Sequence, residues 1–170
     1  MITKGILEFI TISKELCAFL ELSEYESKRI FIDKTQKLLS LLYLKALVLN
    51  SHDDVDGYCE QFVTEEQWNY IQQSIQTTLG DHDVYIEVTS VENKQSEKDT
   101  MPLSEALADV YQDIREFIDR MRTDNDEMRE VAVYECLQNF GMYWGPRVLS
   151  IMQEFHVLLY SVDSEIDNEE

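Results

Sequence analysis

Residues 103–121 read LSEALADVYQDIREFIDRM and decide the fold. Large apolar side chains recur there every three or four residues, the spacing that places side chains on one face of an α-helix. Charged residues such as Glu105, Asp113 and Arg120 fall outside this stripe. The stretch therefore predicts an amphipathic helix packed against other helices. The stripe consists of Leu103, Leu107, Val110, Tyr111, Ile114, Phe117, Ile118 and Met121.

The same spacing recurs on both sides of this stretch and predicts further helices. Thr64 is placed as an N-cap with Gln67 three residues on, and that helix ends before Gly80. The chain has only 5 glycines and 2 prolines among 170 residues, which favours long helices over short strands. We expect an all-α, single-domain helical bundle of about six helices over residues 1–162, followed by an acidic, flexible tail at 163–170. The other helices are expected at 2–22, 25–50, 124–140 and 146–162.

The helix predicted at 25–50 differs from the others because its second half, LLSLLYLKALVL (38–49), is apolar nearly all round. A helix without a polar face is typical of the centre of a bundle. The same helix carries five of the 14 cationic residues. We therefore expect a central helix whose basic residues face acidic neighbours.

Two places do not follow the helical spacing. Val84–Val88 alternates in polarity like a strand, but nothing obvious pairs with it, so we expect an extended middle segment lying across the bundle. The following residues 92–100, ENKQSEKDT, are expected to form an exposed loop. Pro146 either starts a separate last helix or kinks one continuous rod formed with the helix before it.

The charge balance limits the partners. There are 34 acidic and 14 basic residues, a net charge of −20, which repels nucleic acid and anionic membranes. We expect neither as a partner, and an unknown, basic protein partner instead. Cys17, Cys59 and Cys136 are too far apart for a zinc knuckle, and the N-terminus does not resemble a signal peptide. These features predict reduced thiols and a cytoplasmic location.

Several possible metal-binding and catalytic motifs lack residues that they require. The acidic segment 52–63 would need a bidentate glutamate at its last position to bind calcium, and Val63 stands there. Asp81-His82-Asp83 is too small a set for a metal, and no Glu-x-x-His pair includes His156. No phosphate-binding loop or nucleophile elbow is present. We predict no catalytic residue, no metal site and no cofactor.

Two clusters remain as a candidate binding pocket. Asp109 and Asp113 lie one helical turn apart, with Glu116 a further turn on, and stacked carboxylates either bind a cation or form a solvated helix face. The second cluster surrounds the Pro146 break, where aromatic residues and an arginine either line a ligand pocket or plug the core. The candidate pocket consists of Asp109, Asp113, Tyr134, Tyr143, Trp144 and Arg147.

The strings Leu107–Ile114 (LADVYQDI) and Tyr143-Trp144-Gly145, with Leu41–Ala46 and Tyr85–Val88, resemble an uncharacterised bacterial family, domain of unknown function 5063. The version here is similar to that of gut-type Bacteroidetes members, and the resemblance covers most of the chain. It implies a cytoplasmic helical bundle and no assigned activity. Many members carry histidines beside the Trp-Gly pair, and Tyr143 and Arg147 stand at those places here, so no metal or acid–base role carries over.

The sequence thus supports two main hypotheses. The first is a non-enzymatic, intracellular protein-binding or adaptor domain with an acidic surface. The alternative is a small-molecule or metal-assisted enzyme with its site between the helices predicted at 103–121, 124–140 and 146–162. A nucleic-acid mimic is a third, weaker hypothesis, because the acidic residues are spread along the chain.

Overall fold

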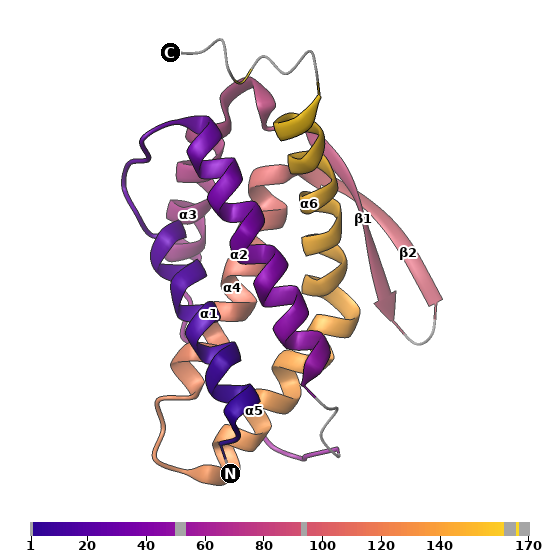
Figure 1. Cartoon of the computed structure of the whole chain (residues 1–170). Coiled ribbons are helices and arrows are strands. Elements are labelled where there is room, and N and C mark those ends of the chain that lie inside the picture. Colours follow the sequence, from indigo (N-terminus) through magenta and orange to yellow (C-terminus); the bar gives the residue numbers. More distant parts are fainter. Residues whose placement is uncertain (1, 50–53, 93–94, 162–165, 167–170) are drawn as a thin grey trace.

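The computed structural model describes residues 2–49, 54–92, 95–161 and 166. The expected acidic tail at 163–170 lies almost entirely outside them. The elements are listed here in chain order: α1 Lys4–Leu20, α2 Lys28–Val48, α3 Glu65–Leu79, a 3-10 turn Gly80–His82, β1 Tyr85–Glu92, β2 Gln95–Pro102, α4 Leu103–Arg120, α5 Asp126–Asn139, a π-helical turn η2 Phe140–Trp144, and α6 Gly145–Tyr160. Figure 1 shows the helices as an elongated bundle.

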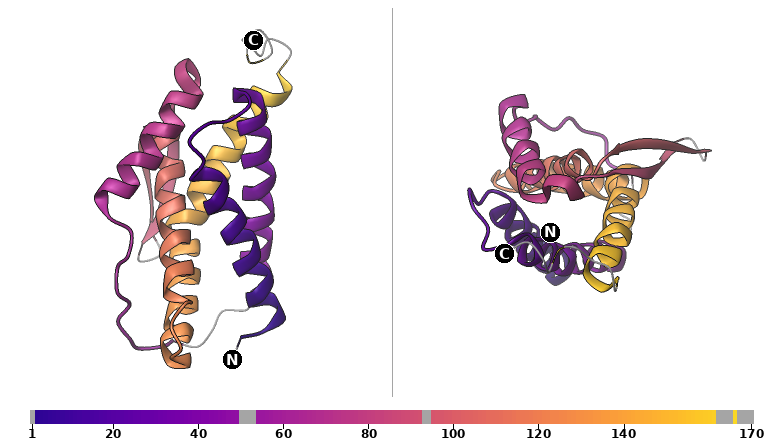
Figure 2. Two further views of the ribbon diagram at one scale, coloured as in Figure 1. Left: turned by 90° about the vertical axis from the view of Figure 1, so that its left-hand side faces the viewer. Right: turned by 90° about the horizontal axis from the view of Figure 1, so that it is seen from above.

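α4 is the central helix. It packs against α1, α3, α5 and α6, and its apolar stripe is buried on all of these sides. The expectation of a central helix at 25–50 was wrong, because α2 lies at the outside of the bundle beside α1 and α6 (Figures 1 and 2). One face of α2 enters the core through Phe31, Leu39 and Leu42, while several of its other apolar residues face solvent.

The described part of the chain forms five continuous helices rather than six. α5, η2 and α6 follow one another without a gap, so the expected fifth and sixth helices are one rod. The join is a π-helical turn, a single wide turn that tends to occur where a helix must accommodate an extra residue. Pro146 sits in the first turn of α6, directly after the π-helical turn.

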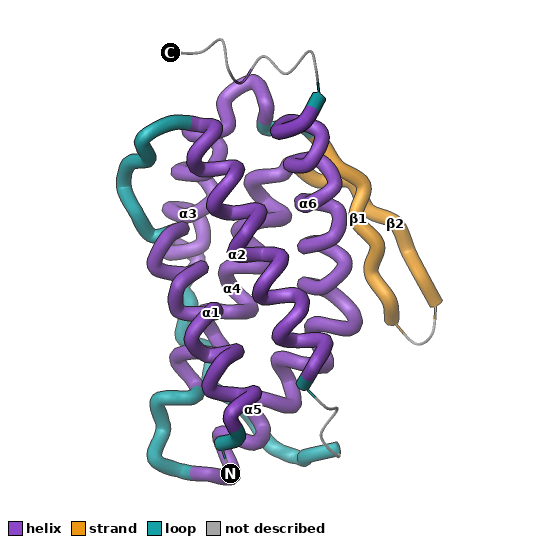
Figure 3. Tube along the Cα trace, viewed as in Figure 1, coloured by secondary structure: helices purple, strands orange, loops and turns teal. Residues whose placement is uncertain are grey.

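A two-stranded antiparallel sheet replaces the expected lone extended segment and exposed loop. β1 pairs with β2 in a register that sets Ile86 opposite Met101, and both are buried with Val88 against the bundle. The residues of β2 before Met101 are polar and exposed, so the pairing depends on backbone hydrogen bonds and leaves little periodicity to detect. The all-α class is therefore approximately right, and the sheet projects from the side of the bundle (Figures 2 and 3).

Local capping fixes where the helices start. The hydroxyl of Thr64 accepts a hydrogen bond from Gln67 N at 3.1 Å, and α3 ends before Gly80 at φ +54°, which confirms both expectations. α4 has no capping side chain of its own. Asp83 supplies one from outside the helix, accepting from Ser104 N at 2.8 Å and Ser104 Oγ at 2.7 Å. Within the residues described, no helix combines the length and apolarity needed to cross a bilayer.

The two glycines of the α5–α6 join differ in the space around them. A Cβ on Gly145 would lie 2.3 Å from the carbonyl oxygen of Phe140, whereas a Cβ on Gly141 would meet nothing within 4 Å. Gly145→Ala is expected to lower the free energy of unfolding by about 1–3 kcal/mol, because backbone must move to admit the methyl group. Gly141→Ala is the control and is expected to raise it by about 0.5–1 kcal/mol. Urea denaturation measures both, and equal effects would contradict the close approach at Gly145.

Candidate functional site

The side chain of Asp109 on α4 links three helices at the candidate site. Trp68 Nε1 of α3 donates a hydrogen bond to Asp109 Oδ1 at 3.0 Å, and Arg147 Nε of α6 lies 3.3 Å from Asp109 Oδ2. The two atoms are close enough for an ion pair, although the Nε–H group does not point at the oxygen. Burial raises the pKa of Asp109, and Arg147 opposes that rise. Both carboxylate oxygens are engaged, so Asp109 holds α3 and α6 against α4.

Asp113 lies one turn further along α4, and its carboxylate has a different environment. It lines a cavity of about 210 Å³ between α4, α5 and the segment before α3. Among the described residues, no hydrogen bond or ion pair reaches its carboxylate. Burial raises the pKa of Asp113 to about 6, with a further rise from Asp109, while Arg147 and Arg120 lower it. Asp113 is thus a half-buried carboxylate that titrates near neutral pH and faces an open polar cavity.

Glu116, the third carboxylate of the stack, is a structural anchor. It accepts hydrogen bonds from the backbone N–H groups of Phe62, at 2.9 Å to the nearer oxygen, and of Val63 at 2.8 Å. Arg120 lies beside it at 3.9 Å, and also donates to Glu135 of α5 at 2.8 Å. A charged acceptor shared by two backbone donors is a strong tie. It holds the segment before α3 over α4 and so forms one wall of the Asp113 cavity.

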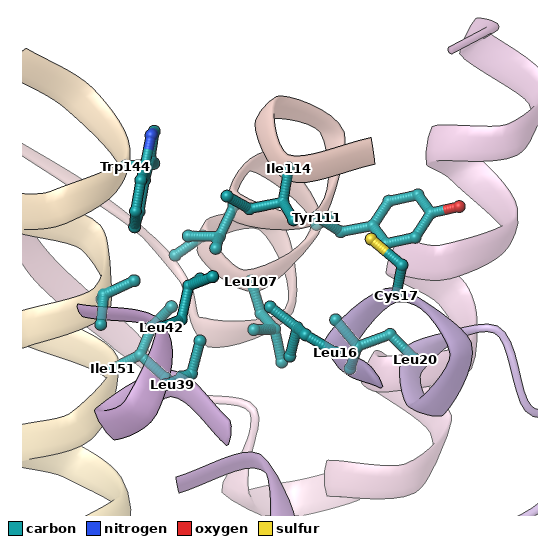
Figure 4. Close-up of a cluster of buried hydrophobic side chains, with 14 of the residues drawn as sticks. Leu16, Cys17, Leu20, Leu39, Leu42, Leu107, Tyr111, Ile114, Trp144 and Ile151 are labelled. Carbon is teal, nitrogen blue, oxygen red and sulfur yellow. The ribbon is translucent and has the colours of Figure 1, made fainter. Parts of the chain in front are cut away.

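The aromatic residues of the candidate pocket are not brought together. Trp144 is fully buried, donates from Nε1 to Cys136 O at 2.9 Å, and stacks near Phe9 and Phe140. Figure 4 shows its ring on the α6 side of the hydrophobic core. Trp144 therefore plugs the core and does not line a ligand pocket. The expectation that it does is corrected, because its ring is fully buried in the core.

The two tyrosines contact different parts of the chain. A hydrogen bond with Asp54 raises the pKa of Tyr134, so this residue contacts the segment before α3. Tyr143 donates a hydrogen bond to Glu92 of β1, and this bond raises the pKa of Tyr143. The charges of Arg147 and Asp113 also act on Tyr143. Of the six predicted pocket residues, Asp109, Asp113, Arg147 and Tyr143 thus form one neighbourhood.

The sequence missed the residues that complete the cavity around Asp113. Most of these residues are polar. They lie on α4, on α5 and in the segment before α3, and have no common spacing in sequence. They come together only in the folded chain, and no sequence pattern indicates them. They are Gln61, Gln112, Glu135, Cys136 and Asn139.

The described residues include several side chains of the types that bind metal ions. No three His, Cys, Asp or Glu side chains within them come together in a way that could hold a metal ion. Asp83 caps α4, as described above, and His82 Nδ1 lies 3.0 Å from Lys28 Nζ. His52 lies outside the described residues.

Glu116→Gln is expected to lower the free energy of unfolding by about 1–3 kcal/mol, because hydrogen bonds to a charged acceptor are replaced by weaker, neutral ones. Amide hydrogen exchange at Phe62 and Val63 is expected to quicken, which mass spectrometry of peptides from this segment would detect. Glu15→Gln on the exposed side of α1 is the control and leaves both readouts unchanged. Unaltered exchange at Phe62 and Val63 in Glu116→Gln would show that this anchor is not needed.

Comparisons with known proteins agree with the fold. The profile of a family described as "Domain of unknown function (DUF5063)" matches residues 1–161. The crystal structure of protein BF1032 from Bacteroides fragilis is similar at a TM-score of 0.79 and 34% sequence identity, over 94% of this chain and 97% of that one. No curated protein matches the chain. The chain belongs to the DUF5063 family, whose function is unknown.

Proposed function

We propose that the protein is a non-enzymatic binding domain that receives a cationic group of a basic partner at Asp113. The observation that carries this proposal is the half-buried Asp113 carboxylate, which has no partner among the described residues and faces a polar cavity. A guanidinium or ammonium group has the donors and the charge that this carboxylate lacks. Glu135, Gln61 and Asn139 offer further acceptors around the same cavity.

The state of Asp113 supports binding over a role in folding. Keeping a carboxylate ionised in a partly buried position without a partner costs stability. Asp109 and Glu116, its neighbours on the same face of α4, are both held by hydrogen bonds. Groups that reduce stability without forming contacts are concentrated at functional sites. A partner cation would compensate the charge of Asp113.

The enzyme alternative has one favourable feature, since an aspartate with a pKa of about 6 can act as a general base near neutral pH. The surrounding groups do not supply the rest of a mechanism. Cys136 lines the same cavity, but burial raises the pKa of its thiol well above the usual value, so a thiolate nucleophile is disfavoured. The adaptor hypothesis therefore has the better support.

Asp113→Asn is expected to raise the free energy of unfolding at pH 7.5 by about 1–3 kcal/mol. The reason is that the folded-state pKa of about 6 lies above the ordinary value of 3.8, so the ionised form is the less stable one in the folded protein. This group makes the wild-type protein lose stability as pH rises from about 4 through about 6, and the variant lacks that loss. Urea denaturation between pH 4 and 7.5 measures the difference. Asp124→Asn, an exposed control, stays within about 0.5 kcal/mol.

Binding is tested by titrating the ¹⁵N-labelled protein with N-acetyl-arginine amide and, as the control, N-acetyl-glutamine amide. Only the cation is expected to shift the amide signals of Gln61 and Asn139, which line the cavity. Affinity is expected to fall about tenfold from pH 7 to pH 5, because the carboxyl group with a pKa of about 6 is then mostly protonated. Asp113→Asn removes the shifts. Equal shifts with the neutral amide, or unchanged binding by Asp113→Asn, would refute the proposed site.

A further inference from the structure

The outer face of α2 exposes several large apolar side chains to solvent. Leu41, Leu44, Leu47 and Val48 are exposed to 45%, 50%, 57% and 59% of their full surface. Leu149 of α6, which packs beside α2, is 50% exposed. Figure 2 shows α1 and α2 at the edge of the bundle with no described element over their outer side. Contiguous exposed apolar residues of this size mark interaction surfaces.

Six of the exposed residues of α2, between Ile30 and Val48, follow a heptad spacing. They are separated alternately by four and three residues over five turns, and each of them is exposed. This is the spacing by which one helix presents a seam to another helix. The buried face of α2 contributes a different set of apolar residues to the core, so the exposed residues are not part of that packing. We call this set the α2 stripe: Ile30, Lys34, Lys37, Leu41, Leu44 and Val48.

Charge distinguishes the α2 stripe from the rest of the molecule. Residues 1–50 hold 7 basic and 6 acidic side chains, whereas residues 51–170 hold 7 basic and 28 acidic ones. The stripe contains two lysines and no acid. Lys34 Nζ lies 5.5 Å from the centre of the Phe19 ring, and Lys37 pairs with Asp33 at 2.6 Å in an exposed i,i+4 contact. Exposed pairs of this kind contribute little and yield readily to a better partner.

We propose that the α2 stripe is the docking surface for an amphipathic helix of a partner protein, with leucine-type residues against Leu41, Leu44 and Val48 and acidic residues opposite Lys34 and Lys37. A second copy of this chain fits less well, because its own stripe has no carboxylate for the two lysines and each copy carries a charge of −20. This surface is distinct from the Asp113 cavity, so the inference does not rest on the proposed function.

The probe is a fluorescein-labelled helical peptide of about three heptads, with leucine at the a and d positions and glutamate at most others. A second peptide carries lysine in place of each glutamate. The acidic peptide is expected to bind at least about tenfold more tightly in fluorescence anisotropy, the reverse of what the overall charge of the protein predicts. Leu44→Glu is expected to weaken binding at least about tenfold, because it places a charge in the apolar seam. Lys34→Glu combined with Lys37→Glu is expected to reverse the preference between peptides.

Leu22→Glu is the matched control, because Leu22 is 47% exposed but lies outside the α2 stripe, and it leaves binding unchanged. All substituted residues are exposed, and circular dichroism verifies that each variant is folded. No binding of the acidic peptide at up to about 500 µM would overturn the proposal, as would tighter binding of the basic peptide. Light scattering tests whether a second copy of this chain, and not a partner helix, covers the α2 stripe. A dimer that forms with rising concentration and is lost in Leu44→Glu would show that a second copy covers the stripe, and would also overturn it.

Discussion

Burial of the apolar stripe of α4 is the constraint on which the rest of the structure depends. The stripe is wider than one neighbouring helix can cover, so α1, α3, α5 and α6 all pack around it. Tyr111 at its centre is fully buried and still satisfies its hydroxyl, which donates to Glu21 and accepts from Gln67, each at 2.7 Å. The polar edge of the same helix therefore faces the junctions between its neighbours, and every carboxylate of the candidate site stands on that edge.

This arrangement gives three similar acidic residues different chemistry. Asp109 is held by Trp68 and Arg147, and Glu116 by two backbone N–H groups, so both act as ties between elements. Asp113, between them, lines the cavity beside α5, and among the described residues no hydrogen bond or ion pair reaches its carboxylate. The difference arises from the neighbouring helices and not from the residues themselves. It explains why Asp109 and Glu116 are held by hydrogen bonds, and why the proposed binding site is at Asp113.

The sequence predicted the parts of the fold that depend on local periodicity. The stripe of α4 and the Thr64 cap are examples, since each is set by residues a few positions apart. Strand β2 was missed because its residues are polar and exposed, so its partner strand and not its own pattern determines it. Trp144 was assigned to the candidate pocket although it is buried in the core, because the sequence did not indicate the π-helical turn that carries it. In the site, the two aspartates were found from their spacing, but the residues from α5 and the segment before α3 required the tertiary structure.

The prediction that the helix at 25–50 is the central one was wrong for a physical reason. An apolar sequence on all sides predicts a buried helix only if the chain itself provides all the partners. In this bundle α4 occupies the centre, so the described elements cover one face of α2, and several apolar residues of its other face are exposed. Exposed leucines at heptad spacing reduce solubility, a cost that the charge of −20 offsets. The cavity at Asp113 and the exposed apolar face of α2 with its two lysines differ in chemistry, and the proposed adaptor role would use both surfaces.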